Sequence, residues 1–394
     1  MRKMPTNFED GDTNRNHHES RPSRLGHHHR CRRPATTANF SRLGVRILLL
    51  SMVVGLFYLV LSQSSFPTQL LQRSYSLNCL SPTCKPDRET ASSSSNVKIH
   101  EFTTNNEDLP SYSKDEIKKL ESALKKAAME NSKTVIITTL NAAWTEPNSI
   151  FDIFLESFSI GYQTQSLVNH VVVVALDQTA YSRCCAVHPH CFALTTSGVD
   201  FSGEATFMSQ DYLKMMWRRI DFLRVVLELG YSFIFSDADV MWLRDPFPRF
   251  DPDADFQIAC DVYKSNSTDP DNIPNGGFKY VKSNHRTIKF YRFWYRGRQY
   301  FPGKHDQDVL NMIKMHPYIS EIELEMRYLD TAYFGGFCEP SKDLDLVCTM
   351  HANCCVGLGK KIHDLRMVIE DWRRYMALSH TSVIGSWSAP WQCR

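Results

Sequence analysis

The chain has 394 residues, of which 42% are hydrophobic, so it is long enough for one large α/β domain with appended segments. Its 45 Lys and Arg residues nearly balance its 43 Asp and Glu residues, so no net positive field indicates nucleic-acid binding. The balance is uneven, because residues 1–46 carry ten basic and four acidic side chains. We expect this segment to be a disordered cytosolic tail.

Residues 47–62 follow the basic tail, contain no charge and predict a membrane anchor. These sixteen residues are short for a hydrocarbon core of about 30 Å, but flanking side chains can snorkel and secretory membranes are thinner than average. The long basic leader and the lack of an Ala-x-Ala-like exit disfavour a cleaved signal peptide, and a buried core helix would show a polar face. Because the positive charge lies upstream, we expect a single-pass type II protein whose body is luminal.

Residues 63–130 predict a stem, since they contain scattered prolines and a serine run over residues 92–95. Near the end of this stem, Ser113 and Glu116 have the spacing of a capping box, which predicts a helix near residues 114–129.

A luminal location would allow disulfides among the eleven cysteines beyond the anchor, and their odd number leaves at least one free or paired between chains. Asn266-Ser267-Thr268 is an acceptor sequence for N-glycosylation in a polar stretch. We therefore expect an exposed loop that carries a glycan on Asn266.

Residues 131–394 predict one catalytic domain that begins with alternating strands and helices. The expected order is a strand over residues 135–140, a helix over 150–160, a strand over 171–176, a helix over about 210–229 and a strand over 231–235. This order predicts a parallel sheet covered by helices on both faces. The later elements are more mixed, with extended segments over residues 256–260 and 276–281 and helices near 285–295 and 307–315.

Two carboxylates, Asp237 and Asp239, come directly after the third of these strands. In an open α/β sheet, ligands bind outside the carboxyl ends of the strands. Two carboxylates one residue apart can hold a divalent cation while the cation binds a diphosphate, which is the arrangement a sugar-nucleotide transferase requires. A solvated acidic turn is the alternative, and it would be favoured if the motif stood alone.

Two further segments carry polar groups suited to a sugar. In Asn275-Gly276-Gly277 the glycines let the backbone approach a ligand and the amide can bind hydroxyls, although a plain turn has the same pattern. Asp306-Gln307-Asp308 opens a predicted helix. These side chains could bind sugar hydroxyls, bring a carboxylate to the anomeric carbon, or simply cap the helix.

His351 follows the apolar residues 346–350, which predict a strand, so its imidazole could join two carboxylates around Mn²⁺. Lys360 and Lys361, a little farther along, could neutralise a departing diphosphate or belong to an ordinary basic surface. Two rival sets have the spacing of zinc sites: Cys348, His351, Cys354 and Cys355, and Cys184, Cys185, His188 and Cys191. In an oxidising lumen we expect most of these sulfurs to be disulfide-bonded or structural instead.

Taken in order, these segments resemble the plant nucleotide-diphospho-sugar transferase family. That family includes xylosyltransferases of rhamnogalacturonan II and arabinosyltransferases of hydroxyproline-rich glycoproteins. The matching segments are Thr139–Asn141, Gly230–Tyr231, Ser236–Val240, Trp242–Pro246, Asn275–Phe278, Asp306–Asn311 and His351–Cys355. The resemblance covers residues from about 134 to 361, and the ordered combination is far more specific than any one segment.

The resemblance implies a GT-A type, Rossmann-like mixed α/β sheet covered by helices. It also implies a retaining transfer of a sugar from a UDP-sugar in the Golgi, dependent on Mn²⁺ or Mg²⁺. The implied metal ligands are Asp237, Asp239 and His351, with Asp237 also facing the ribose. The implied substrate-binding residues are Thr139, Asn141 and Arg219 at the nucleotide, Asn275, Gly276 and Gly277 at the sugar, and Lys360 or Lys361 at the diphosphate. The implied catalytic segment is Asp306, Gln307 and Asp308. Arg218 and Arg224 compete with Arg219 for its role.

The resemblance thus predicts a Golgi glycosyltransferase that acts on a cell-wall polysaccharide or glycoprotein acceptor. A catalytically silent relative that binds glycans or scaffolds other transferases would share the fold, but it should have lost part of the metal-binding set, which is complete here. A luminal metallohydrolase would show a denser cluster of His and Asp than this chain offers. No residue is an obvious nucleophile, so front-face departure and a covalent intermediate both stay open.

Overall fold

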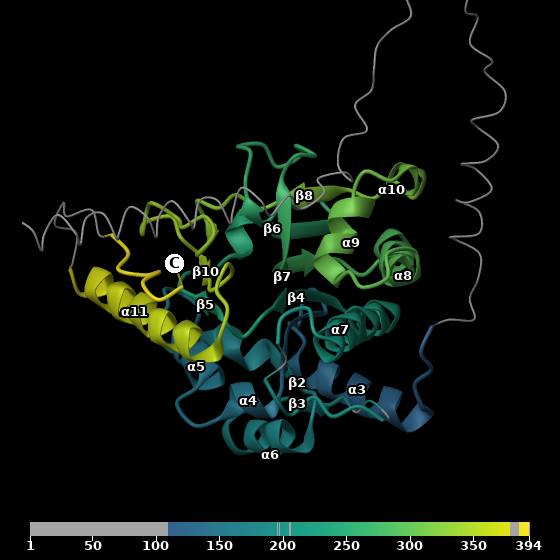
Figure 1. The fold of residues 1–394 in the computed structure, drawn as a ribbon, viewed down its shortest axis with the longest axis horizontal. Helices are drawn as coiled ribbons and strands as arrows, with labels where there is room; N and C mark the ends of the chain where they lie inside the picture. Colours follow the sequence, from purple (N-terminus) through teal and green to yellow (C-terminus); the bar gives the residue numbers. More distant parts are fainter. Residues whose placement is uncertain (1–108, 195, 197, 205, 379–385, 394) are drawn as a thin grey trace, which may run out of the picture. The chain divides into compact units, whose positions relative to one another are not determined.

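The computed structural model describes residues 109–194, 196, 198–204, 206–378 and 386–393. Its centre is a seven-stranded sheet with the strand order β3-β2-β1-β4-β7-β6-β8 (Figure 1). The strands are β1 (Thr134–Leu140), β2 (Val171–Ala175), β3 (Cys191–Ala193), β4 (Ser232–Ser236), β6 (Phe256–Val262), β7 (Ile273–Val281) and β8 (Met326–Tyr328).

The first four strands along the chain, β1 to β4, form the parallel half of the sheet. β1 pairs with β2 and β4, and β2 pairs with β3, all in parallel register. The longer helices between these strands are α5 (Ile150–Ile160), α6 (Gln178–Val187) and α7 (Gln210–Glu228). β7 then pairs antiparallel with both β4 and β6, and β8 lies parallel to β6. The predicted mixed α/β sheet is confirmed, and among the described strands of this sheet β7, from the second half of the domain, is the one that runs antiparallel to the others.

Helices cover both faces of this sheet. On β1, Val135 and Ile137 pack into one hydrophobic core and Ile136 packs into the other, because successive side chains of a strand point to opposite faces. The helices that contribute to the first core are α3 (Lys114–Ala127), α7, α8 (His285–Tyr300) and α9 (Asp306–Ile313). The second core contains side chains of α5 and of α11 (Leu358–Ala377).

A second sheet of three short strands lies next to the end of β4. Its order is β5 (Val240–Trp242), β10 (Thr349–His351) and β9 (Phe334–Gly336). β10 runs antiparallel to β5 and sets His351 opposite Val240, so the imidazole comes beside the acidic segment from far along the chain. The strand expected over residues 346–350 begins only at Thr349, because the amides of Leu346 and Val347 form a turn by donating to the carbonyl of Asp343.

The predicted long helices are present with small shifts at their ends. The capping box of α3 is formed, since Ser113 Oγ accepts from the Glu116 amide at 3.2 Å and the Glu116 carboxylate accepts from the Ser113 amide at 2.8 Å. The elements that the sequence did not predict are α4 (Ala142–Thr145), α6, α10 (Pro317–Glu321), α11, β3, β5, β8, β9 and the 3₁₀ helices Gln165–His170 and Phe247–Arg249. Apart from α6 and α11, these elements are so short that they give almost no periodic signal.

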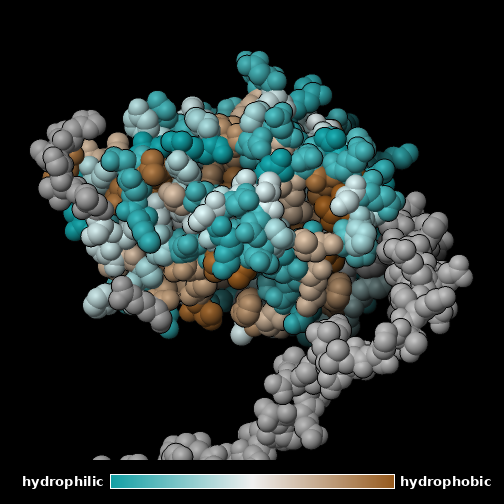
Figure 2. All heavy atoms as spheres, turned by 90° about the horizontal axis from the view of Figure 1, so that it is seen from above, coloured by the Kyte–Doolittle hydropathy of each residue, from teal (hydrophilic) through white to brown (hydrophobic). Residues whose placement is uncertain are grey.

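The predicted tail, the anchor and most of the stem lie outside the described residues. Within the part of the chain that the structure describes, no helix is both long and apolar enough to cross a membrane. On the face seen in Figure 2, hydrophilic side chains dominate and apolar ones form small separate patches. Trp242, Trp294 and Trp372 are fully buried, whereas Trp391 is exposed.

Three disulfides join the described cysteines. The pairs are Cys184–Cys191, Cys338–Cys354 and Cys355–Cys393. Both rival zinc sites are therefore wrong, because each would need sulfurs that are already oxidised. The expectation that most of these sulfurs are disulfide-bonded is confirmed, and the described cysteines that remain free are Cys185, Cys260 and Cys348.

Candidate active site

A pocket of about 650 Å³ lies at the carboxyl ends of β1 and β4. Twelve residues singled out from the sequence line it: Thr139, Asn141, Arg219, Asp237, Asp239, Asn275, Gly276, Gly277, Asp306, Gln307, His351 and Lys361. Residues from seven separate stretches of the chain therefore meet at one place, as the rule for open α/β sheets predicts.

The acidic pair occupies the turn between β4 and β5. The Asp237 amide donates to the Gly277 carbonyl at 2.6 Å, and the Asp237 carbonyl accepts from the Val240 amide at 3.1 Å. These bonds hold a tight turn in which the Asp239 side chain is buried and that of Asp237 is partly exposed. Ligand atoms of Asp237, Asp239 and His351 all lie within 4.8 Å of one another.

The Asp239 carboxylate is held ionised by its neighbours. Burial opposes its ionisation, but the charges of Lys361 and His351 outweigh burial and hold the pKa of Asp239 well below its usual range. Lys361 Nζ donates to Oδ2, and His351 Nε2 lies 3.2 Å from Oδ1. Despite that contact, Oδ1 is buried and lacks a hydrogen-bond donor of good geometry. An oxygen in this condition suits a cation, and carboxylates with one imidazole are a donor set that Mn²⁺ accepts.

Gly277 is required beside this cluster because the strand passes so close to it. A Cβ atom added at Gly277 would lie 2.7 Å from Asp237 Oδ2 and closer still to His351 Cε1. The Gly277 amide donates to Asn275 Oδ1 at 2.8 Å. Gly277 therefore has a steric reason, and the plain-turn alternative is set aside because this segment lies within β7.

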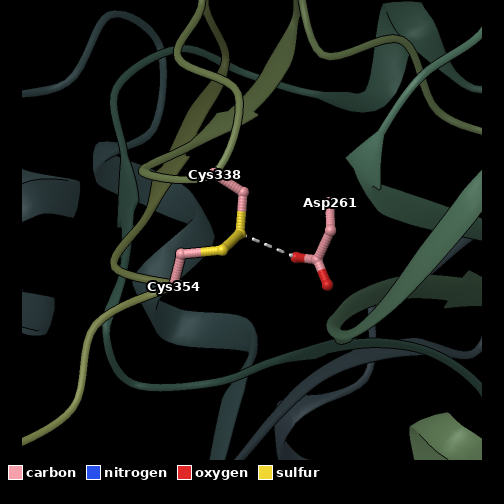
Figure 3. Close-up of side chains that lie close together, drawn as sticks. All are labelled: Asp261, Cys338 and Cys354. Carbon is pink, nitrogen blue, oxygen red and sulfur yellow. Dashed lines mark hydrogen bonds between the residues drawn. A yellow bond between two sulfur atoms is a disulfide. The ribbon is translucent and has the colours of Figure 1, made fainter. Parts of the chain in front are cut away.

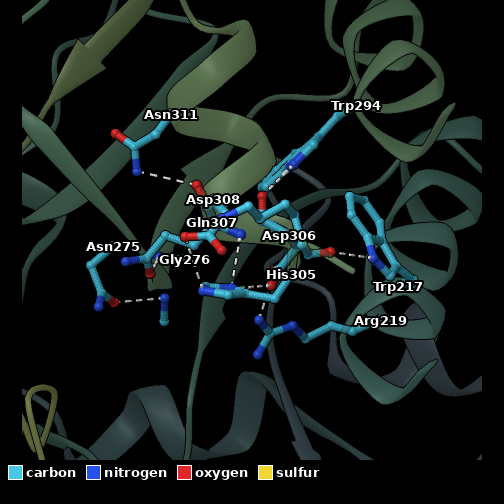
Figure 4. Close-up of polar contacts among 12 residues, drawn as sticks. Trp217, Arg219, Asn275, Gly276, Trp294, His305, Asp306, Gln307, Asp308 and Asn311 are labelled. Atoms are coloured by element: carbon cyan, nitrogen blue, oxygen red, sulfur yellow. Dashed lines mark hydrogen bonds and ion pairs between the residues drawn. The ribbon is translucent and has the colours of Figure 1, made fainter. Parts of the chain in front are cut away.

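Arg219 links the acidic pair to helix α9. From α7, its Nη1 donates to Asp237 at 2.8 Å. Its Nη2 donates to Asp306 at 2.8 Å (Figure 4). Arg219 is buried and packs over the ring of Phe235. Arg218 and Arg224, the neighbours that competed for its role, pair with Asp221 instead.

The start of α9 presents Asp306 and Gln307 to the pocket. His305 is the N-cap, and Trp294 Nε1 donates to the Asp306 carbonyl at 2.8 Å. Burial opposes ionisation of Asp306, but the charge of Arg219 and a hydrogen bond from His305 hold its pKa well below the usual range. Asp308 does not line the pocket. Because each helical residue turns the side chain by about 100°, Asp308 faces another way, and it lies 3.4 Å from His305.

Two of the remaining predicted residues also differ from the expectation. Asn141 lines the pocket, but its Nδ2 donates to the carbonyls of Phe201 and Gly203 at 2.9 Å each, so both amide hydrogens are engaged. Lys360 is exposed and lies outside the pocket, because α11 turns it away when Lys361 faces inward. Of the two lysines left open by the sequence, Lys361 is the one at the site.

Asn266 lies in an exposed turn between β6 and β7, as expected for a glycosylation loop. Its Oδ1 accepts from the amide and the hydroxyl of Thr268, both at 3.0 Å. Asn266 does not line the pocket.

Several pocket residues were missed by the sequence analysis. The polar ones include Glu204, Tyr212, Asp261, His305 and Asn353, and the apolar ones include Trp144, Phe207 and Met216. Asp261 follows a predicted strand, and His305 and Asn353 adjoin motifs already recognised, so position alone could have found these three.

The sequence analysis also missed Lys279, which does not line the pocket but holds the backbone of Gly276, a residue that does. It is fully buried on β7, and its Nζ donates to the Gly276 carbonyl at 2.8 Å. The ammonium lies over the rings of Phe235 and Trp294. Burial, aided by repulsion from Arg219, lowers the pKa of Lys279 to about 7.

Comparison with known proteins shows what the chain is similar to. The family model for nucleotide-diphospho-sugar transferases matches residues 166–365. An uncharacterised protein of Arabidopsis thaliana is 55% identical over 282 residues, which are 71% of this chain and 74% of that protein. A UDP-D-xylose:L-fucose alpha-1,3-D-xylosyltransferase of the same plant is 28% identical over 109 residues, which are 28% of this chain and 30% of the enzyme. The solved structure of the galactosyltransferase LgtC with donor and acceptor sugar analogs is 12% identical, with a TM-score of 0.32 over 58% of this chain and 94% of that one.

Proposed function

The chain belongs to the nucleotide-diphospho-sugar transferase family, and from that premise we propose that it is a metal-dependent glycosyltransferase of the GT-A type. The donor would be a UDP-sugar, and the acceptor a cell-wall polysaccharide or glycoprotein. One observation carries the proposal: the cluster of Asp237, Asp239 and His351 shares a single pocket with Asp306 and Gln307. A cation site beside sugar-binding groups is what transfer from a nucleotide-diphospho-sugar needs.

Asp237, Asp239 and His351 would hold Mn²⁺ or Mg²⁺. The buried, unpartnered Oδ1 of Asp239 supports this assignment, as does the convergence of the three ligand atoms. When bound, the cation would neutralise charge that develops on the departing diphosphate. Lys361 would add a positive charge at the same end of the pocket, since it already contacts Asp239.

The other pocket residues would bind and orient the donor. Thr139, at the end of β1, would face the nucleotide, with Asn141 holding the loop around it through its two bonds to carbonyls. Gln307 and the Asn275–Gly277 backbone would meet the sugar. Asp306 carries no proton near neutral pH, because its pKa is held low, so it would accept hydrogen bonds from hydroxyls rather than donate a proton.

We propose that the transfer retains the anomeric configuration. Retention by departure and attack on the same face needs no protein nucleophile. The Asp306 carboxylate is engaged by Arg219 and His305, which makes it a poor nucleophile. These engagements support the front-face route over a covalent intermediate.

We also propose a Golgi location with residues 47–62 as the type II anchor and the described domain in the lumen. The disulfides among the described cysteines support an oxidising compartment. An N-glycan on Asn266, detected as a mass shift that peptide N-glycosidase removes, would be the consequence. An unmodified Asn266 in protein isolated from plant cells would contradict the luminal location.

The experiment that tests the function is the thermal shift of the full-length protein with a panel of nucleotide sugars, with and without Mn²⁺. We expect stabilisation by one UDP-sugar only when the metal is present, and loss of that stabilisation in Asp239→Ala. Asp271→Ala, at an exposed acid outside the pocket, is the matched control. Unchanged UDP affinity in Asp239→Ala with Mn²⁺ would overturn the assignment. Binding without turnover would favour the silent, glycan-binding relative.

A further inference from the structure

Asp261 lies near the end of β6, where the pairing of β6 with β7 is irregular. Ile258 pairs with Lys279, but the next pairs are Cys260 with Pro274 and Val262 with Ile273, so the register shifts twice. Cys260 packs into the same core as Ile258. Because successive side chains of a strand point to opposite faces, Asp261 faces the other way, and it lines the pocket.

Three carboxamides converge on the Asp261 carboxylate. Asn275 and Asn353 donate their Nδ2 hydrogens to Oδ1 at 2.8 Å and 2.7 Å, and Gln307 donates an Nε2 hydrogen to Oδ2 at 2.9 Å. The three amides come from β7, from the segment after β10 and from α9. All three line the pocket, so one carboxylate ties together three segments of its wall.

An ionised carboxylate only accepts hydrogen bonds, so it fixes which end of each amide points toward it. The opposite ends are then committed to backbone amides. Gln307 Oε1 accepts from the Gly276 amide at 2.9 Å, and Asn275 Oδ1 accepts from the Gly277 amide at 2.8 Å. Figure 4 shows Gln307 and Asn275 on either side of Gly276. Asp261 therefore determines the conformation of the backbone that we expect to face the sugar.

The Cys338–Cys354 disulfide closes the remaining side of Asp261 (Figure 3). Cys338 Sγ lies 3.3 Å from Asp261 Oδ1. An oxidised sulfur has no hydrogen to donate, so this contact confines the carboxylate by packing. Asn353 Oδ1 accepts from the Cys338 amide at 3.1 Å, which joins the disulfide to the same network.

We propose that Asp261 is the positioning residue for the sugar end of the pocket, acting through Gln307, Asn275 and Asn353. This role rests on the proposed function as far as the sugar is concerned. A merely structural role would lower stability and would not discriminate between a nucleotide and a nucleotide sugar. A positioning role affects binding of the sugar and leaves the nucleotide end, around Thr139 and the metal ligands, unchanged.

The test uses Asp261→Asn in the full-length protein. Asparagine has nearly the same shape, but its NH₂ group faces one of the three amide donors, so at least one amide must turn. Asp261→Ala removes the acceptor without adding a donor, and it serves if the first variant does not fold. Asp253→Asn, which makes the same substitution at an exposed residue just before β6, is the matched control.

The first readout is hydrogen exchange at the amides of Gly276 and Gly277. We expect exchange at least about tenfold faster in Asp261→Asn than in the wild type or the control, because the acceptors of both amides lose their fixed orientation. Unchanged exchange at both glycines would overturn the proposal. This readout needs no ligand, so it judges Asp261 even if the proposed function fails.

The second readout is affinity for UDP and for UDP-xylose or UDP-galactose in the presence of Mn²⁺, since these donors are named for relatives of the chain. We expect the UDP affinity of Asp261→Asn to stay within about twofold of the wild type. The ratio of its UDP-sugar affinity to its UDP affinity should fall at least about tenfold. An equal loss for UDP and for the UDP-sugar would overturn the positioning role in favour of a structural one. Failure of the wild-type protein to bind UDP would instead count against the proposed function.

Discussion

Arg219 on α7 and Asp306 at the start of α9 form a buried ion pair, with Nη2 2.8 Å from Oδ2, although 87 positions separate them in the chain. The same guanidinium contacts Asp237 through Nη1 at 2.8 Å. The metal-side carboxylate and the helix that carries Gln307 are therefore connected through one side chain. A substitution at Arg219, Asp237 or Asp306 should therefore alter the positions of the other two side chains.

Replacing Arg219 by methionine should destabilise the protein by about 3–5 kcal/mol, because it leaves the buried Asp306 carboxylate without its partner. Urea unfolding of the full-length protein near pH 7 measures this loss. Lys214→Met, on the same helix with an exposed ion pair to Asp211, should change stability by less than about 0.5 kcal/mol. Equal stability of the two variants would contradict the importance of the buried pair.

Lys279 should make stability rise with pH. Its pKa is lowered to about 7 in the folded protein, whereas it is about 10.4 in an unfolded chain. The unfolded state therefore binds more protons between these values, so the free energy of unfolding increases from about pH 7 to about pH 10. The slope from this one group is at most about 1.4 kcal/mol per pH unit. Below pH 7 both states are protonated, and the contribution is constant.

Lys279→Met should lack that rise, so the difference between variant and wild type isolates the group from other titrations. Urea unfolding at about pH 6.5, 8 and 9.5 gives the two curves. Lys289→Met, which removes an exposed lysine on α8, should run parallel to the wild type. Parallel curves for Lys279→Met would show that the buried amine does not titrate in this range.

The sequence could predict those elements and site residues that are determined by residues close to them in the chain. The strand before Asp237 contains the apolar residues Phe233–Phe235, and the two carboxylates come where it ends, so both the element and its site were predictable. The capping box at Ser113 is equally local. The pairing of β7 between β4 and β6 is not, because it depends on contacts that no window of residues contains.

The missed residues follow the same division. A lysine in a strand usually indicates that its side of the strand faces solvent. Lys279 is buried instead, because its ammonium donates to the Gly276 carbonyl and lies over the rings of Phe235 and Trp294. Asp261 acquires its partners from segments that lie 14 to 92 positions farther along the chain. Tertiary partners, rather than local propensity, determine both positions.

Gly277→Ala should disrupt the proposed metal ligands, since the added Cβ would lie 2.7 Å from Asp237 Oδ2 and still closer to His351. We expect Mn²⁺-dependent UDP affinity to fall at least about tenfold, the equivalent of about 1.4 kcal/mol. Isothermal titration measures it. Gly276→Ala is the matched control, because its Cβ would come no closer than 3.6 Å to Asp306 Oδ2, which is ordinary contact. If the two variants bind UDP equally well, then a side chain at position 277 does not disturb Asp237 and His351, and the steric explanation for this glycine is wrong.

Removing the Cys338–Cys354 disulfide should weaken the site as well as the fold. The bond closes a segment of 16 residues, and a loop of about 15 residues corresponds to about 3 kcal/mol in the chain-entropy model. Cys354 follows Asn353 directly and lies three residues after His351, so the double variant Cys338→Ser/Cys354→Ser should also reduce Mn²⁺-dependent UDP affinity. Cys184→Ser/Cys191→Ser removes a bond outside the pocket that spans 7 residues, and it should lower stability without changing that affinity. Equal UDP affinity in the two double variants would mean that strand pairing between β5 and β10 holds His351 without help from the disulfide.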